Sequence, residues 1–170
     1  MSGTMNFSSL KEYFYRLYNT CLVRLLLSMG LFLLIYYLLL SGLFSPYIIE
    51  PELINFLRYT YLVLIVISLT IVHLVIHKRL KIFSETVGLG DKLDLYHSVV
   101  KVRMKTVVGI SLFNAAGLLF TGHSWFGIYF GGMILWTVVQ WPTPRKVCNQ
   151  LRLRGDERTM VMTKGEAFEF

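Results

Sequence analysis

Two histidines are the residues best spaced for chemistry in this chain. His73 and His77 are four residues apart at the end of an apolar run, so a helix places both imidazoles on one face. Such a pair can bind one metal ion or present a haem ligand. His97 could approach the pair if the chain folds back as a hairpin. No cysteine or carboxylate partner is evident, so a structural role is favoured, in which His77 joins the neighbouring basic residues at an interface and His73 bonds another helix.

Two amide side chains, Asn114 and Gln140, fall inside apolar runs. They could line a transport pathway, but amides also join membrane helices through hydrogen bonds, and helix joining is the favoured interpretation. All ten acidic residues lie outside the apolar runs. Because intramembrane carboxylates are the usual groups that couple transport to protons or sodium, the sequence argues against a small proton-coupled exporter.

Small residues repeat at helical spacing in two of the apolar runs. Gly127 and Gly131 form a GxxxG face that Gly132 extends, and Ser111 and Ala115 form a second small-residue face. Lipid supplies no hydrophobic drive between helices, so faces of this kind mark close helix contacts. We expect them to pack within the chain, with docking of a partner subunit as the alternative.

The motifs of common enzymes are absent from the sequence. It contains no serine nucleophile elbow, HExxH or CxxC set, and the 88–91 segment lacks the lysine and third glycine of phosphate loops. Cys21 and Cys148 fall on segments expected in the cytoplasm, where a structural disulfide is disfavoured. The sequence therefore predicts no catalytic residue, no metal site and no resident cofactor.

These residues must be positioned by membrane helices. Of the 170 residues, 55% are hydrophobic and only 16% are charged, whereas soluble domains carry about 25% charged residues. Four long apolar runs, at about 25–44, 59–76, 106–122 and 125–141, predict an all-α, four-transmembrane-helix bundle (residues 25–141). The 77–105 connection predicts cytoplasmic helical extensions of spans 2 and 3 joined at Gly88-Leu89-Gly90, with Asp91 as an N-cap.

The two ends of the chain are predicted to be polar segments. In residues 1–24, an amphipathic helix over 9–21 begins at a Ser9/Glu12 capping box and either lies in the headgroup plane or continues into the first span. Residues 142–170 form a basic tail, in which 159–170 suggests a hairpin about Lys164-Gly165.

Orientation follows from the positions of the basic residues. Sixteen of the 17 Lys and Arg lie in the N-terminal segment, the 77–105 connection and the tail, and only Arg58 lies on the other side. The positive-inside rule then places both termini in the cytoplasm, and a bacterial inner membrane is favoured.

The net charge of +7 is better explained by anionic headgroups than by nucleic acid. The leading functional hypothesis is a non-catalytic subunit or scaffold of a membrane complex, which docks other subunits or a second copy. The alternatives are a small oligomeric transporter or channel, and a haem- or metal-binding redox subunit that uses the three histidines.

Overall fold

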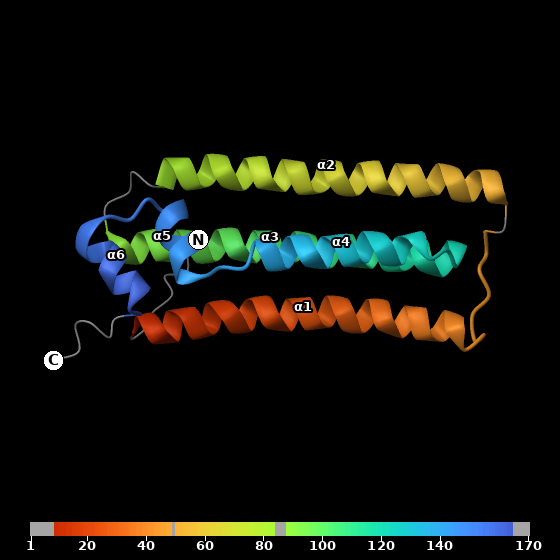
Figure 1. The fold of residues 1–170 in the computed structure, drawn as a ribbon, viewed down its shortest axis with the longest axis horizontal. Coiled ribbons are helices and arrows are strands. Elements are labelled where there is room, and N and C mark those ends of the chain that lie inside the picture. Colours follow the sequence, from red (N-terminus) through yellow and green to blue (C-terminus); the bar gives the residue numbers. More distant parts are fainter. Residues whose placement is uncertain (1–8, 49, 84–87, 165–170) are drawn as a thin grey trace. The chain divides into compact units, whose positions relative to one another are not determined.

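The structure, a computed structural model, describes residues 9–48, 50–83 and 88–164. Within these ranges it is all helical and contains no strand, which confirms the predicted class (Figure 1). The helices are α1 (Leu10–Leu40), α2 (Pro51–Phe83), α3 (Leu89–Thr121), α4 (Trp125–Val139), α5 (Pro144–Gln150) and α6 (Gly155–Met162).

Three helices, α1, α2 and α3, are long and apolar enough to cross a membrane. Their most apolar stretches differ in exposure, because 11% of the residues are buried in α1 and in α2 but 50% in α3. α4 is apolar but has only 15 residues, which is about 22 Å of helix against a hydrocarbon core of about 30 Å. The described residues therefore contain three helices long enough to span a membrane, and the fourth predicted span coincides with a shorter helix.

α1 joins the predicted amphipathic segment and the first span into one helix. The Ser9 hydroxyl accepts a hydrogen bond from the Glu12 amide at 3.2 Å, as the capping box predicts. Tyr13, Phe14 and Leu17, on the expected apolar face, are at most 1% exposed. Other parts of the protein cover this face, so the segment is a continuation of the span and not a separate helix in the headgroup plane.

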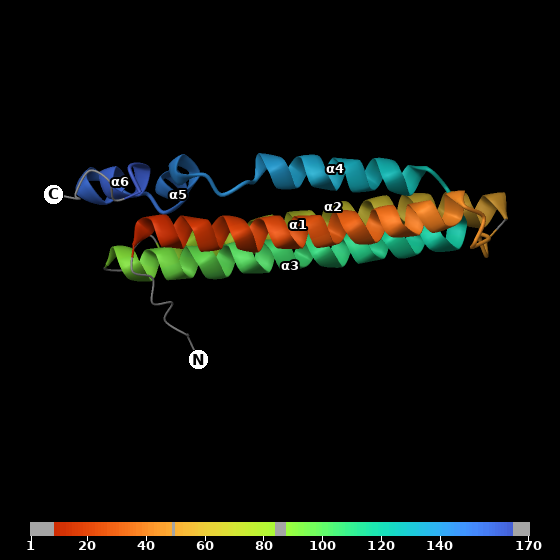
Figure 2. The same ribbon diagram turned by 90° about the horizontal axis from the view of Figure 1, so that it is seen from below.

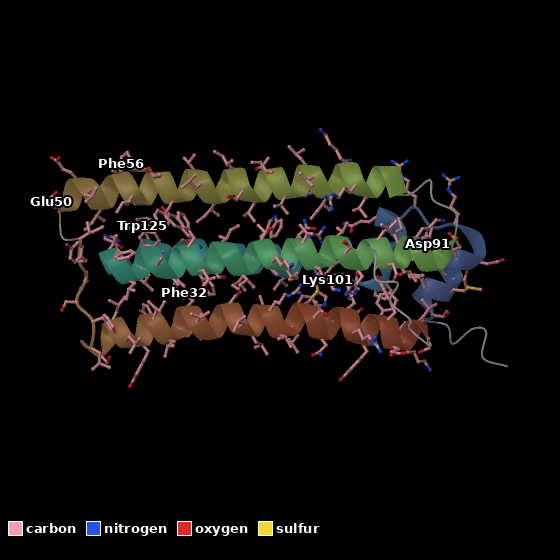
Figure 3. All side chains as sticks on the ribbon, turned by 180° about the vertical axis from the view of Figure 1, so that it is seen from behind. Phe32, Glu50, Phe56, Asp91, Lys101 and Trp125 are labelled. Atoms are coloured by element: carbon pink, nitrogen blue, oxygen red, sulfur yellow. The ribbon has the colours of Figure 1, made fainter. Side chains whose placement is uncertain are left out.

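The connection between spans 2 and 3 is helical on both sides, as predicted. α2 continues to Phe83 and α3 begins at Leu89. The expected N-cap is wrong, because Asp91 lies inside the first turn of α3 (Figure 3). Gly88 precedes the helix with φ +106° and its carbonyl accepts from the Lys92 amide, so the backbone conformation that glycine permits starts α3.

The tail forms α5 and α6, which follow α4 in Figure 2. Thr143 caps α5 by accepting from the Lys146 amide, and Pro144 occupies its first turn, the preferred place for proline. The predicted hairpin is wrong in its first arm, because 159–162 belongs to α6. The second arm, 167–170, lies outside the described residues.

The chain divides into two compact units. The unit that we call the apolar unit comprises Val23–Val72 and Met104–Trp141. Its core draws on α1, α2, α3 and α4 and is rich in rings. Phe32 stacks on Phe130 at 4.1 Å between ring centroids, and Tyr61 stacks on Phe113 at 4.0 Å. Figure 3 shows Phe32 pointing from α1 toward the neighbouring helices of this unit.

The unit that we call the basic unit comprises Met1–Leu22, His73–Arg103 and Pro142–Phe170. Its described core combines apolar side chains of α1, α3, α5 and α6 with buried polar ones. The Tyr13 hydroxyl donates to the Leu93 carbonyl at 2.9 Å, and both groups are buried. The Lys92 ammonium of α3 pairs with the Glu157 carboxylate of α6 at 2.9 Å.

A backbone contact ties the α1–α2 loop to the α3–α4 turn within the apolar unit. The Phe120 carbonyl, at the end of α3, accepts from the Tyr47 amide at 3.0 Å and from the Ile48 amide at 2.9 Å. Gly122 has φ +63°, and a Cβ there would lie 2.5 Å from Pro46. The close approach of the loop to the turn therefore needs glycine at this position.

Candidate functional site

A cavity of about 280 Å³ lies within the basic unit, between α2, α3 and the α5 segment. Its lining combines basic, amide and apolar side chains: His73, Ile76, His77, Leu80, Arg103, Asn149, Gln150 and Arg152. The four α2 residues follow a spacing of three, one and three, which places them on one helix face. The cavity therefore has one helical wall on which two imidazoles alternate with two aliphatic side chains.

The structure brings His73 and His77 together, as their spacing predicts, but not with His97. His97 is 3% exposed, and its ring lies 6.2 Å from that of Tyr13. Among residues 9–48, 50–83 and 88–164, no three histidine, cysteine or acidic residues are grouped so that they could hold a metal ion. The neighbours of the His73/His77 pair are instead two arginines.

The charge of this cavity favours an anion. Arg103 and Arg152 contribute guanidinium groups, and among the residues that the structure describes no acidic side chain lines the cavity. Arg103 is only 4% exposed, so its charge is shielded from bulk solvent and acts at a lower effective dielectric constant. Two imidazoles and two amides add hydrogen-bond donors beside these cations.

Arg152 holds its position in a conformation that is uncommon for arginine. It follows Leu151, the C-cap of α5, and has φ +53°. Helices often end in this left-handed conformation, usually with glycine and sometimes with asparagine. Arg152 also lines a second cavity, of about 400 Å³, with Arg154, Arg158 and part of α5.

Neither cysteine has the environment of a nucleophile. Cys21 and Cys148 are both buried. Burial raises the pKa of the Cys148 thiol above its ordinary value, although the charge of Arg158 partly opposes this effect. Because the thiolate is the reactive form, this increase in pKa lowers the reactivity of Cys148 at neutral pH.

The two predicted small-residue faces have different surroundings in the apolar unit. Ser111 and Ala115 are 2% and 1% exposed, and the Ser111 hydroxyl lies 3.7 Å from the Met133 sulfur of α4. By contrast, a Cβ added at Gly127, Gly131 or Gly132 would meet no atom of the described residues within 4 Å. The α3 face is therefore in contact with α4, and the glycine face of α4 is open.

The close packing of aromatic rings against α3 in this unit depends on a different glycine, Gly117, which was not predicted from the sequence. A Cβ at Gly117 of α3 would lie 2.3 Å from the Phe126 ring and 2.8 Å from the Tyr61 ring. Two aromatic rings thus occupy the space that a side chain at Gly117 would need.

Asn114 and Gln140, the predicted amide pair, lie in different environments. Asn114 is 0% exposed, and neither atom of its amide forms a hydrogen bond within the described part of the chain. Gln140 is the C-cap of α4, where its backbone amide bonds to the Trp136 carbonyl.

Arg58, the basic residue that stands apart in the charge count, is held by aromatic side chains. Its guanidinium carbon lies 3.5 Å from the centre of the Trp125 ring, a cation–π contact between α2 and α4. The Tyr129 hydroxyl donates to the Arg58 carbonyl at 3.3 Å. In Figure 3 Trp125 points toward α2.

The two arginines of the cavity, Arg103 and Arg152, were not predicted as site residues. In the sequence they contribute only to the positive-inside signal. No local motif links them, because they are almost fifty positions apart and meet through the packing of α5 in the basic unit. The spacing of His73 and His77 was the one signal in the sequence that pointed here.

The comparisons with known proteins give no relative. No protein-family model matches the chain, and no curated protein or solved structure matches it significantly. The fold and the cavity are therefore the basis for any assignment.

Proposed function

We propose that this chain is a non-catalytic, four-span subunit of a membrane complex with both termini in the cytoplasm. Its glycine face on α4, which consists of Gly127, Gly131 and Gly132, binds a transmembrane helix of a partner subunit. The basic segments at the cytoplasmic surface provide the second contact surface. No catalytic role is assigned to any residue.

The fourth span in this proposal is α4. Its helix is about 8 Å shorter than the hydrocarbon core by the usual rise per residue. Tryptophans at its start and beyond its end, Trp125 and Trp141, suit the two interfaces, and a short span is accommodated by local thinning of the bilayer. The strong inequality of basic residues supports an even number of crossings, because it places both ends on one side.

The open glycine face is the observation that carries the proposed partner contact. Glycines let two helix backbones approach closely, and that approach is the main source of helix association in lipid. The small-residue face of α3 already packs against a helix of the same chain, because Ser111 contacts Met133 of α4. The α4 face has the same chemistry, and within the described part of the chain no atom lies within 4 Å of a Cβ added at its glycines.

The test is purification in mild detergent followed by mass spectrometry of the wild type and a Gly127→Ile, Gly131→Ile double variant. The wild type should carry a stoichiometric membrane partner, and the double variant should lose it, since two branched side chains hold the helices apart. Gly30→Ile is the matched control, because Gly30 on α1 is also in open space. A wild type that runs as a lone monomer would contradict the proposal, as would a double variant that keeps its partner.

Asn114 supports a second candidate, a small oligomeric transporter or channel. A buried amide without hydrogen bonds costs about 1–3 kcal/mol, and polar groups inside membrane helices are often kept for function. Flux of ions or small solutes through vesicles that contain the wild type, but not through those with Asn114→Leu, would favour this candidate. Equal permeability of protein-free and protein-containing vesicles would count against it.

A further inference from the structure

From the chemistry of the α2–α3–α5 cavity we propose that it binds a phosphate group, either of a phospholipid headgroup or of a small phosphorylated molecule. This inference does not depend on the proposed partner contact. Figure 1 shows the three elements that supply the lining, α2, α3 and α5.

The cationic groups select the class of ligand. Arg103 and Arg152 line a cavity of about 280 Å³, and none of the side chains that line it within the described residues is acidic. Arginine presents planar, directed N–H donors that match the oxygens of phosphate. A cation would meet two guanidinium groups at once, so the pair of imidazoles is better placed to donate to an anion than to hold a metal.

The uncharged lining fits the neutral part of such a ligand. Ile76 and Leu80 are 4% and 6% exposed and form the aliphatic part of the α2 wall. The side-chain oxygen of Gln150 is buried and has no hydrogen bond within the described residues, so it can accept from a hydroxyl group. A phosphate ester of glycerol offers both features, with hydroxyl groups next to the phosphate and carbon atoms beyond it.

The position of the lining residues in the sequence suits the membrane surface. His77 is followed by Lys78 and Arg79 at the end of the second apolar run, and Asn149 and Arg152 lie in the basic tail. Anionic headgroups concentrate at this depth on the cytoplasmic side. The lipid arm and the soluble arm of the test below separate the two sources of phosphate.

The lipid arm uses the full-length protein in nanodiscs of phosphatidylcholine with or without phosphatidylglycerol, followed by release into detergent and native mass spectrometry. One phosphatidylglycerol molecule should remain bound per chain. The soluble arm titrates inorganic phosphate and glycerol 3-phosphate into the protein in detergent by isothermal calorimetry. Binding in either arm supports the proposal and identifies the source.

Arg152→Asn is the decisive variant. Asparagine accepts the left-handed conformation more readily than most residues, so this change removes the charge without opposing the turn after α5. We expect about a tenfold or greater loss of affinity, the range for one charge-assisted hydrogen bond. Arg152→Lys should recover part of it, and circular dichroism checks that the helices are intact.

Two arginine variants serve as matched controls. Arg79→Gln makes the same charge change at an exposed α2 residue next in sequence to Leu80, and Arg158→Gln makes it in the second cavity, which Arg152 shares. Both should keep wild-type affinity. Equal losses in Arg79→Gln and Arg152→Asn would show a diffuse basic surface and overturn the proposal. A loss confined to Arg158→Gln, or no binding in either arm, would overturn it as well.

Discussion

The two units of this chain use opposite chemistry to bury and expose their side chains. In the apolar unit many large apolar side chains of α1 and α2 are exposed, such as Leu34 and Val66 at 56% and 55%. Only five charged residues belong to it, and they are Arg24, Glu50, Glu52, Arg58 and Lys105. The basic unit instead exposes charges and buries polar groups such as His97 and Arg103.

This difference shows which forces can hold each unit together. Where lipid surrounds the helices, apolar burial adds little to helix association, and packing must supply the stability. The apolar unit accordingly has stacked rings and a glycine that admits them. In the basic unit, hydrogen bonds and ion pairs link elements that are far apart in sequence. Substitutions that separate these two kinds of contact test the comparison.

The largest effect is expected at Gly117. Gly117→Val places a branched side chain where Phe126 and Tyr61 lie, and overpacking of this kind costs about 1–3 kcal/mol or more. The thermal midpoint in detergent, followed by circular dichroism, should fall by several degrees or the protein should fail to purify. Gly109→Ala is the control on the same helix, because a Cβ there meets nothing within 4 Å. If the two changes lower the midpoint equally, the packing of aromatic rings at Gly117 is not what stabilises this unit.

Asn114 is a fully buried polar side chain in the apolar unit, and its replacement by an apolar residue should stabilise the protein. Asn114→Leu removes a buried amide that forms no hydrogen bond within the described residues. Relief of that desolvation is worth about 1–3 kcal/mol, less any strain from the different shape. The midpoint of unfolding in a denaturing-detergent titration should rise. A decrease would indicate that the amide has a partner, such as a bound solute or another subunit.

A smaller loss is expected from Tyr13→Phe in the basic unit. The change deletes the hydrogen bond to the Leu93 carbonyl and leaves the ring in place, so the expected destabilisation is about 0.5–1.5 kcal/mol. Tyr15→Phe is the control, because Tyr15 is two positions away and 73% exposed. If Tyr15→Phe is as harmful as Tyr13→Phe, the buried hydrogen bond is not what stabilises this unit.

The smallest expected effect is on the rate at which the Cys148 thiol is alkylated. Since burial raises the pKa of its thiol, the thiolate fraction at a given pH is below that of a free cysteine. Alkylation by iodoacetamide should be slow at neutral pH, and its rate should increase toward a plateau at higher pH than for a cysteine peptide. Peptide mass spectrometry of a Cys21→Ser protein over a pH series measures this rate. If the rate reaches its plateau at a lower pH than in the peptide, burial does not raise the pKa of this thiol.

The apolar runs and their periodicity were sufficient to predict the helical class and the long apolar helices. These features depend on residues close in sequence, as does the Ser9 cap. The helix boundaries were less accessible, because Asp91 and Gly88 are both good residues for a helix start and only the backbone conformation decides between them.

The parts that sequence could not give depend on distant contacts. Gly117 resembles the other glycines of the apolar runs until the positions of Phe126 and Tyr61 are known. Likewise, Arg103 and Arg152 share a cavity only because α5 packs in the basic unit. The glycine spacing in α4 predicted a contact, but spacing alone does not say whether the neighbour is in the same chain.

The hydrogen bonds from Tyr47 and Ile48 to Phe120 limit where the orientation of the chain can be measured safely. A reporter inserted at 46–48 would break this link and disturb the α3–α4 turn with it. Leu43 and Phe44, in the same loop, are 69% and 52% exposed. A cysteine at Leu43 is therefore the better place for a membrane-impermeant label, which in the proposed topology should reach it from the non-cytoplasmic side of the membrane only.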